Sequence, residues 1–220
     1  MHGAVIFDLD GVLIDSEGLQ YRAYAQVLER FGIRISIEEY AAHWIAVGRG
    51  PEYAVQTYRL PVSPLELRAL KQPVYHAIMR QQVELMPGVK EVLARLQPCF
   101  ALGVATNSNR DDVSFVMRQL DLGRFFTSIV TREDYVLAKP EPDAYLTSAV
   151  HLGVSPRACV VIEDTYRGTL AAHRAGAIPV AVPNSLTRDN DFSLAASVLG
   201  SLDELTAALA ARLLAERAGE

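Results

Sequence analysis

The chain has 220 residues, half of them hydrophobic, and a formal net charge of -5 at pH 7. This composition is sufficient for a packed core and excludes a disordered chain, while the mild acidity argues against a nucleic-acid-binding surface. No apolar run reaches the roughly 20 residues that a membrane-spanning helix needs. The N-terminus, interrupted by Asp8 and Asp10, lacks the pattern of a signal peptide.

The first apolar run, residues 4–7, is a predicted buried strand that ends in two aspartates, Asp8 and Asp10, followed by Gly11. Side chains at i and i+2 of an extended segment lie on the same side of the backbone. Two carboxylates about 4 Å apart repel each other by roughly 4 kcal/mol at an effective dielectric near 20. Such a pair suits a cation site, or a nucleophile with an acid. A turn or a helix N-cap is the alternative, because aspartate is common at both.

The next region, residues 15–86, contains no comparable apolar run. Hydrophobic side chains recur at helical spacing between Leu19 and Phe31 and again between Leu65 and Ile78, and glycines and prolines separate these stretches. We therefore expect a helical insertion after the first strand, with hinges near residues 12–16 and 86–88. An insertion over the carboxyl edge of a sheet would act as a lid.

In the rest of the chain, short apolar runs alternate with amphipathic segments. The expected strands cover residues 100–105, 128–130, 158–162 and 178–182, and the expected helices cover residues 89–96, 111–120, 144–152, 168–175 and 202–214. This alternation indicates a parallel sheet with helices on both faces. Right-handed crossovers bring the carboxyl ends of its strands to one edge, where such sheets bind ligands.

Polar side chains follow the second predicted strand, beginning with Thr106, Asn107 and Ser108. Ser108 together with Asp111 resembles a capping box that would open the next helix. The free N–H groups at such a helix start form a potential anion site. Simple capping of the helix remains the alternative interpretation of these residues.

Two further groups complete the set of polar residues at the predicted sheet edge. Pro140 and Pro142 stiffen the loop that carries Lys139, although a single loop lysine is often merely solvated. The fourth strand ends in Glu163 and Asp164. Two acidic pairs at strand ends would gather up to four carboxylates, which need a hard cation. Mg²⁺ is bound in this way, by one or two carboxylates, waters and phosphate oxygens.

The order of these motifs resembles that of the haloacid dehalogenase superfamily: Asp8-Leu9-Asp10-Gly11, Thr106, Lys139-Pro140 and Glu163-Asp164. The resemblance extends over nearly the whole chain and is strongest to the phosphatases and sugar phosphomutases with a helical cap after the first strand. It implies an α/β fold with two domains. A Rossmann-like, doubly wound parallel sheet core would comprise residues 1–14 and 87–220, and a helical cap domain would comprise residues 15–86.

The resemblance also implies roles for the matching residues. Asp8 would be the nucleophile that takes up the phosphoryl group, and Asp10 would protonate the leaving oxygen and later activate water. Thr106 and Asn107 would hold phosphate oxygens. Lys139 would bridge the nucleophile and the phosphate. General acid assistance of the kind expected from Asp10 contributes about 10²–10⁴ in rate.

By the same resemblance, Mg²⁺ would be the cofactor. Its ligands would be Asp8, the backbone carbonyl of Asp10, and Asp164, with Glu163 in or just behind that shell. A carboxylate that attacks a phosphate dianion must overcome repulsion, and a divalent cation together with Lys139 neutralises that charge.

Three positions help to choose among the chemistries of the superfamily. Dehalogenases lack an acid at the position of Asp10, because a halide leaves without a proton. β-Phosphoglucomutases place a histidine partner for this aspartate at the position of Gln20, and glutamine cannot relay a proton. Arg49 matches a cap arginine that these mutases use on the distal phosphate, and a solvated loop charge is the alternative for it.

We therefore predict a Mg²⁺-dependent phosphatase that acts on a small phosphorylated metabolite, a sugar or polyol phosphate, through an aspartyl-phosphate on Asp8. The alternatives are a sugar phosphomutase and a non-catalytic binding module on the same fold. No nucleic-acid or membrane partner is expected, and relatives of this kind favour a monomer. Cys99 and Cys159 are expected to be buried free thiols, which predicts a cytoplasmic location.

Overall fold

The computed structural model describes residues 3–219 and divides into two compact units. The sheet unit comprises the chain up to Ile14 and from Leu85 onward, and the helical unit comprises Asp15–Glu84. The two segments that connect them are paired: the N–H of Asp15 donates to the carbonyl of Glu84 (3.1 Å), and Ile14 forms an antiparallel bridge with Leu85. The insertion expected from the sequence, residues 15–86, extends two residues beyond Glu84.

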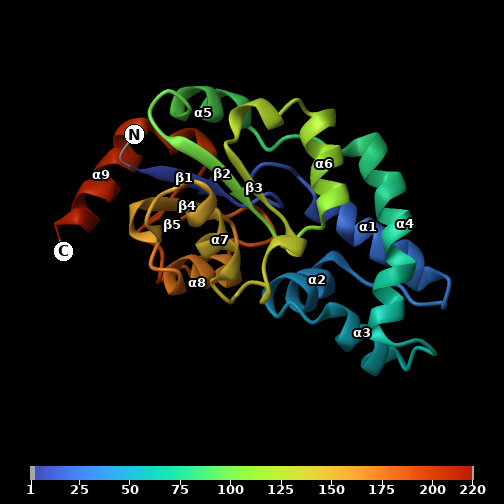
Figure 1. The fold of residues 1–220 in the computed structure, drawn as a ribbon. Coiled ribbons are helices and arrows are strands. Elements are labelled where there is room, and N and C mark those ends of the chain that lie inside the picture. The colour runs from blue at the N-terminus through green and yellow to red at the C-terminus, as the bar shows by residue number, and fades with distance from the viewer. Residues whose placement is uncertain (1–2, 220) are drawn as a thin grey trace. The chain divides into compact units, whose positions relative to one another are not determined.

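Six parallel strands form the centre of the sheet unit, in the order β3-β2-β1-β4-β5-β6 (Figure 1). They are β1 (Ala4–Phe7), β2 (Ala101–Ala105), β3 (Ser128–Val130), β4 (Cys159–Glu163), β5 (Ile178–Ala181) and β6 (Ser197–Val198). β1 pairs with both β2 and β4, so that Phe7 lies opposite Val104 and Ile162. After β1 the chain forms β2 and β3 on one side of this strand and then crosses to β4, β5 and β6 on the other side, which makes the ends of β1 and β4 a topological switch point. The predicted doubly wound α/β fold is confirmed.

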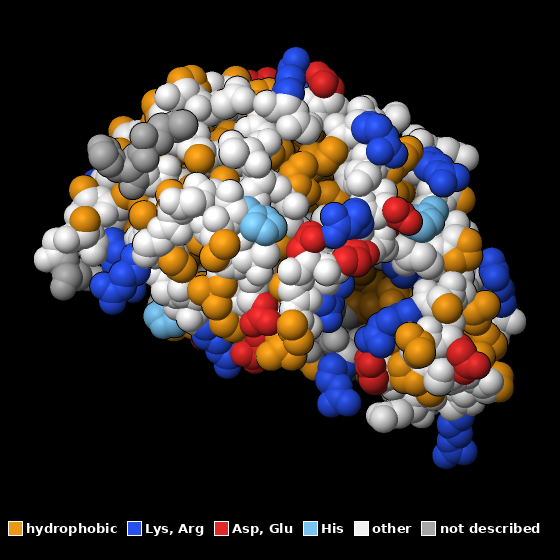
Figure 2. Space-filling model, viewed as in Figure 1, with side chains coloured by type: hydrophobic (Ala, Val, Ile, Leu, Met, Phe, Trp, Pro, Cys, Tyr) orange, Lys and Arg blue, Asp and Glu red, His pale blue; other side chains and the backbone are white. Residues whose placement is uncertain are grey.

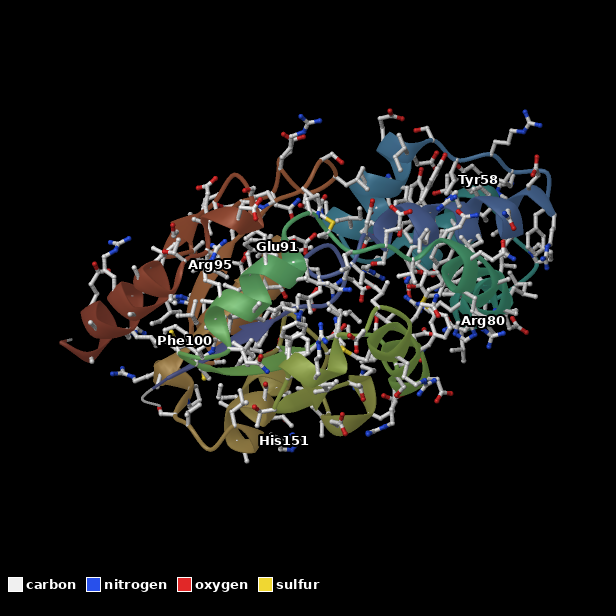
Figure 3. All side chains as sticks on the ribbon, turned by 90° about the horizontal axis from the view of Figure 1, so that it is seen from above. Tyr58, Arg80, Glu91, Arg95, Phe100 and His151 are labelled. Carbon is white, nitrogen blue, oxygen red and sulfur yellow. The ribbon has the colours of Figure 1, made fainter. Side chains whose placement is uncertain are left out.

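Helices cover both faces of this sheet. They are α5 (Val89–Leu96), α6 (Arg110–Gln119), α7 (Asp143–His151), α8 (Tyr166–Arg174) and α9 (Ala207–Ala218). Helices α7 and α8 pack against Ile6 and Val161 in one hydrophobic cluster, and α5 lies on the opposite side of the sheet (Figure 1). Arg95 of α5 donates to the carbonyls of Asp203 and Leu205 and so ties this helix to the segment before α9 (Figure 3).

Some details differ from the sequence-based expectations. Helix α9 begins five residues later than expected because Leu202–Glu204 forms a separate 3₁₀ turn and Thr206 caps the helix by accepting the N–H of Leu209. The two-residue strand β6 was not anticipated. Cys159 is buried as expected, but the expectation for Cys99 was wrong: it lies beyond the end of α5 and is exposed.

The helical unit contains α1 (Glu17–Glu29), α2 (Ile37–Tyr40), a π-helical segment (Ala41–Ala46), α3 (Gly50–Tyr58) and α4 (Pro64–Gln82). A capping box starts α4: the Ser63 hydroxyl accepts the N–H of Glu66, and the Glu66 carboxylate accepts the N–H of Ser63. Helices α1 and α4 pack against each other and bury apolar side chains such as Val27 and Leu67. The helical periodicity of the sequence therefore corresponds to real helices.

Charged side chains of both signs are interspersed on the face shown in Figure 2, and no continuous basic patch is visible there among the described residues. Within residues 3–219, no helix is both long enough and apolar enough to cross a membrane.

Candidate active site

Acidic side chains from two neighbouring strands meet at the carboxyl edge of the sheet. Asp8 directly follows β1, Glu163 is the last residue of β4, and Asp164 follows it. Each contributes a carboxylate oxygen to a group in which all three oxygens lie within 4.8 Å of one another. All three residues are buried, with exposed fractions of 8%, 1% and 1%. The structure therefore brings these three predicted site residues together.

Lys139 is the cation of this cluster and is itself buried. Its Nζ donates to Oδ1 of Asp8 (2.6 Å), to Oε1 of Glu163 (2.7 Å) and to the carbonyl of Ala105 (2.9 Å). Burial alone would lower the pKa of the lysine, but the carboxylates of Asp8 and Glu163 outweigh this effect and raise the pKa above its usual value. The ammonium therefore stays charged and links the ends of β1 and β4.

The single positive charge of Lys139 does not neutralise the carboxylates of the cluster. If Asp8, Glu163 and Asp164 were all ionised, the buried site would carry a net charge of -2 with Lys139 included. Burial raises the pKa of Asp8 to about 8; the Lys139 charge opposes this rise, and the charges of Glu163 and Asp10 add to it. A cluster of carboxylate oxygens with this excess negative charge fits a hard divalent cation such as Mg²⁺.

The two oxygens of Glu163 are occupied by donors of the protein itself. Oε1 accepts hydrogen bonds from Lys139 and from the hydroxyl of Tyr145. Oε2 accepts the N–H groups of Asp164 (3.2 Å) and Thr165 (3.4 Å) and the Thr165 hydroxyl (3.2 Å). We infer that Glu163 belongs behind a metal shell rather than in it, where it orients Lys139.

The loop after β2 faces Asp10 with two hydroxyl groups. Oδ2 of Asp10 accepts a hydrogen bond from the Ser108 hydroxyl (2.6 Å), and the Thr106 hydroxyl lies 3.4 Å away. The expected capping box of Ser108 and Asp111 was wrong, because Asn109 caps α6 by accepting the N–H of Asp112 (3.0 Å). Ser108 is thereby available to hold Asp10.

Asn107 is exposed at the same strand end, and hydrogen bonds to its amide oxygen orient its side chain. Its Oδ1 lies 2.7 Å from the hydroxyl of Tyr135 and accepts the N–H of Lys139 (3.2 Å). The Tyr135 hydroxyl also lies 2.9 Å from the carbonyl oxygen of Thr106. Because the amide oxygen is engaged with the protein, the amide NH₂ of Asn107 is the group that can donate to an anion.

The remaining two predicted site residues, Gln20 and Arg49, belong to the helical unit. Oε1 of Gln20 accepts a hydrogen bond from Nζ of Lys71 (2.7 Å), which is buried and lies 4.5 Å from the ring centroid of Tyr75. Arg49 is exposed at the N-cap position of α3.

Several side chains that support the cluster were not identified from the sequence. They are Ser108, Tyr135, Tyr145, Arg167 and Asn184. Tyr145 has the spacing of an ordinary core residue of α7, and Arg167, which donates to the carbonyl of Lys139 (2.6 Å), resembles a surface residue of α8. Ser108 and Asn184 each lie three residues after the end of a strand, but neither has a local pattern that separates it from an ordinary capping or loop residue.

Gly168 gives a test of how tightly Glu163 is held. A Cβ at position 168 would lie 1.8 Å from the Glu163 carboxyl group, which its donors hold in place. Alanine in a helix is normally about 1 kcal/mol more favourable than glycine, but here we expect Gly168→Ala to lower the free energy of unfolding. In the control Gly18→Ala, no atom lies within 4 Å of the added Cβ, and urea denaturation should show equal or higher stability. Equal effects of the two substitutions would contradict this account.

The raised pKa of Asp8 predicts a pH dependence in metal-free protein. Since the ordinary pKa is 3.8 and the folded value is about 8, the folded state binds this proton more tightly, so stability should fall as pH rises between these values. In EDTA, the unfolding midpoint of the parent protein should therefore fall relative to that of Asp8→Asn between about pH 5 and pH 8. Parallel midpoints across this range would show that the Asp8 pKa is not raised.

Comparisons with known proteins agree with this geometry. Residues 5–182 match the model of the haloacid dehalogenase-like hydrolase family. The chain is 32% identical over 209 residues to hexitol phosphatase B of Escherichia coli, covering 93% of this chain and 94% of that protein. It is also 32% identical over 177 residues to the phosphorylated carbohydrates phosphatase of Thermotoga maritima, covering 79% and 81%.

A similar solved structure is that of a mutant of CbbY from Rhodobacter sphaeroides in complex with xylulose-(1,5)bisphosphate. It has a TM-score of 0.80 and 26% identity, and the match covers 93% of this chain and 96% of that one. The two curated relatives named above are phosphatases, in agreement with the enzyme class predicted from the sequence. Because the family model spans most of the sequence, this chain belongs to the haloacid dehalogenase-like hydrolase family.

Proposed function

We propose that this protein is a Mg²⁺-dependent phosphatase that hydrolyses a small phosphorylated sugar or polyol through an aspartyl-phosphate on Asp8. The observation that carries the proposal is the buried cluster in which Lys139 joins Asp8 and Glu163 beside Asp164. The relatives named for phosphatase activity on hexitols and phosphorylated carbohydrates support the substrate class.

The donor set at the strand ends fits Mg²⁺. Asp8, Asp164 and the backbone carbonyl of Asp10 would supply hard oxygen ligands, with waters and a substrate oxygen as the others. When bound, the cation supplies neutralisation of the negative charge on the phosphoryl oxygens.

In the first half-reaction, a carboxylate oxygen of Asp8 attacks phosphorus and the bond to the leaving oxygen breaks. Lys139 holds Oδ1 of Asp8, so the nucleophile is oriented before substrate binds. Thr106 and the amide NH₂ of Asn107 donate to phosphoryl oxygens. Asp10 gives its proton to the leaving alkoxide, which departs as an alcohol.

In the second half-reaction, Asp10 is the base. It takes a proton from a water molecule that attacks phosphorus, the bond between phosphorus and the Asp8 oxygen breaks, and inorganic phosphate leaves as the Asp8 carboxylate is restored. The Ser108 hydroxyl, 2.6 Å from Oδ2 of Asp10, would keep the carboxyl group in one position through both steps.

Position 20 holds glutamine, which cannot relay a proton. This favours transfer of the phosphoryl group to water over its transfer back to a sugar. The Gln20 amide oxygen is engaged by Lys71, and an amide does not titrate.

The cytoplasmic location, the monomeric state and the absence of nucleic-acid and membrane partners stay predictions.

The central test is phosphate release from p-nitrophenyl phosphate and from a panel of hexitol and sugar phosphates. We expect turnover with Mg²⁺, none in EDTA, and a loss of about 10³-fold or more in kcat for Asp8→Asn, because the nucleophile is gone. When the phosphorylated intermediate is trapped with a labelled phosphoryl group, the label should be on Asp8. If β-glucose 1-phosphate with a bisphosphate primer gives glucose 6-phosphate faster than free phosphate, the protein is a mutase. If no substrate turns over, a binding module is favoured.

The role of Asp10 predicts a dependence on the leaving group. Asp10→Asn should lower kcat/KM by about 10²–10⁴ for alkyl phosphates, because their alkoxides need a proton to leave. For p-nitrophenyl phosphate, whose leaving group needs no proton, the rate of the first half-reaction should fall much less. That rate is measured as the rate of the nitrophenol burst. The control Asp111→Asn removes the same charge from the exposed first turn of α6. Equal losses for both kinds of substrate would rule out Asp10 as the acid.

A further inference from the structure

The loop after β5 contributes a side chain to the acidic cluster. Nδ2 of Asn184 donates a hydrogen bond of 2.8 Å to Oδ2 of Asp164. The two residues are 20 positions apart and come from the ends of neighbouring strands, β4 and β5. Asn184 thus lies next to the carboxylate that follows β4, at the edge where the site is built.

The orientation of the Asn184 side chain is fixed within its own loop. Its Oδ1 accepts the N–H of Leu186 (2.9 Å), and its backbone N–H donates to the hydroxyl of Thr187 (2.9 Å), which is fully buried. The carbonyl of Asn184 accepts the N–H of Arg188 (3.0 Å). Because only the amide oxygen can accept from Leu186, the NH₂ group is the one directed to Asp164.

The segment after β1 also lies against the hydrogen-bonded pair of Asp164 and Asn184. Gly11, which follows the Asp8 and Asp10 motif, has a φ of +79°, and a Cβ there would lie 2.2 Å from Oδ2 of Asp164 and 3.0 Å from Nδ2 of Asn184. Because Gly11 has no Cβ, the hydrogen-bonded pair fits beside it without a steric clash. Segments from β1, β4 and β5 together restrict the carboxyl group of Asp164 to one orientation.

The two acids at the end of β4 have different partners. Glu163 shares the ammonium of Lys139 with Asp8, whereas Asn184 gives Asp164 a neutral amide donor. A neutral donor fixes one carboxylate oxygen and leaves the negative charge of the group in place. This is the condition in which a carboxylate is a strong ligand for a hard cation.

We propose that Asn184 is a positioning residue for the metal site: it holds Asp164 in the orientation that binds a divalent cation and thereby sets the affinity for Mg²⁺. This inference rests on the proposed Mg²⁺ site. Outer-shell partners of metal ligands commonly change affinity by about 10–100-fold, so loss of the amide donor should weaken Mg²⁺ binding by about tenfold or more.

The test is Mg²⁺ binding measured by isothermal titration calorimetry on the full chain without substrate. Asn184→Leu keeps the number of side-chain heavy atoms and their branching and removes the amide group that donates to Asp164, and its Kd should rise about tenfold or more. Asn190→Leu is the matched control: Asn190 follows in the same loop and accepts the N–H of Tyr166 (2.9 Å), a backbone contact, through its amide oxygen. Its Kd should stay within about twofold of the parent value.

Circular dichroism checks that the variants are folded, and Asn184→Ser, whose side chain is too short to reach Asp164, replaces Asn184→Leu if the latter does not fold. An unchanged Kd in the Asn184 variants, or an equal rise in Asn190→Leu, overturns the inference even if the parent is an active phosphatase. Tight Mg²⁺ binding that needs Asn184 in a protein without phosphatase activity would support the inference and overturn only the proposed function. A parent protein that does not bind Mg²⁺ overturns both.

Discussion

A single buried ammonium, that of Lys139, connects two carboxylates that would otherwise repel each other inside the protein. Removing one partner from a buried pair of this kind typically destabilises a protein by about 3–5 kcal/mol, because the other charge is left uncompensated. Here the lysine serves Asp8 and Glu163 at once, so it contributes both to the joining of β1 and β4 and to the charge of the site. The remaining negative charge is what makes the site suited to a cation and to a phosphate brought in with it.

The network around this lysine is continuous with the hydrophobic core. Tyr135 and Tyr145 belong to the apolar cluster that packs α7 and α8 on the sheet, and their hydroxyl groups contact Asn107 and Glu163. Each ring is therefore fixed by packing while its polar end fixes a site residue. The positions of the site residues are in this way determined by core packing, which changes little under thermal motion.

The sequence was sufficient for the parallel sheet and for the acids at its edge, because both have local signals. Near-continuous apolar runs mark buried strands, and the strand-end acids Asp8, Glu163 and Asp164 follow them directly. It was not sufficient for Ser108, since serine and asparagine both cap helices and Asn109, one residue later, fills that position. Asn184 was missed for a different reason: one asparagine in a polar loop has no pattern until the pairing of β4 with β5 is known.

The paired connectors between the two units have a consequence for how such a protein can diversify. The N–H of Met86 donates to the carbonyl of Leu13, next to the Asp15 and Glu84 contact, so the chain leaves and re-enters the sheet unit at one point. Doubling the length of a segment whose ends are already adjacent adds only about 0.6 kcal/mol of closure entropy. The inserted helices can therefore be exchanged, shortened or enlarged at little entropic cost, while the strand register, and with it the acidic cluster, is inherited unchanged.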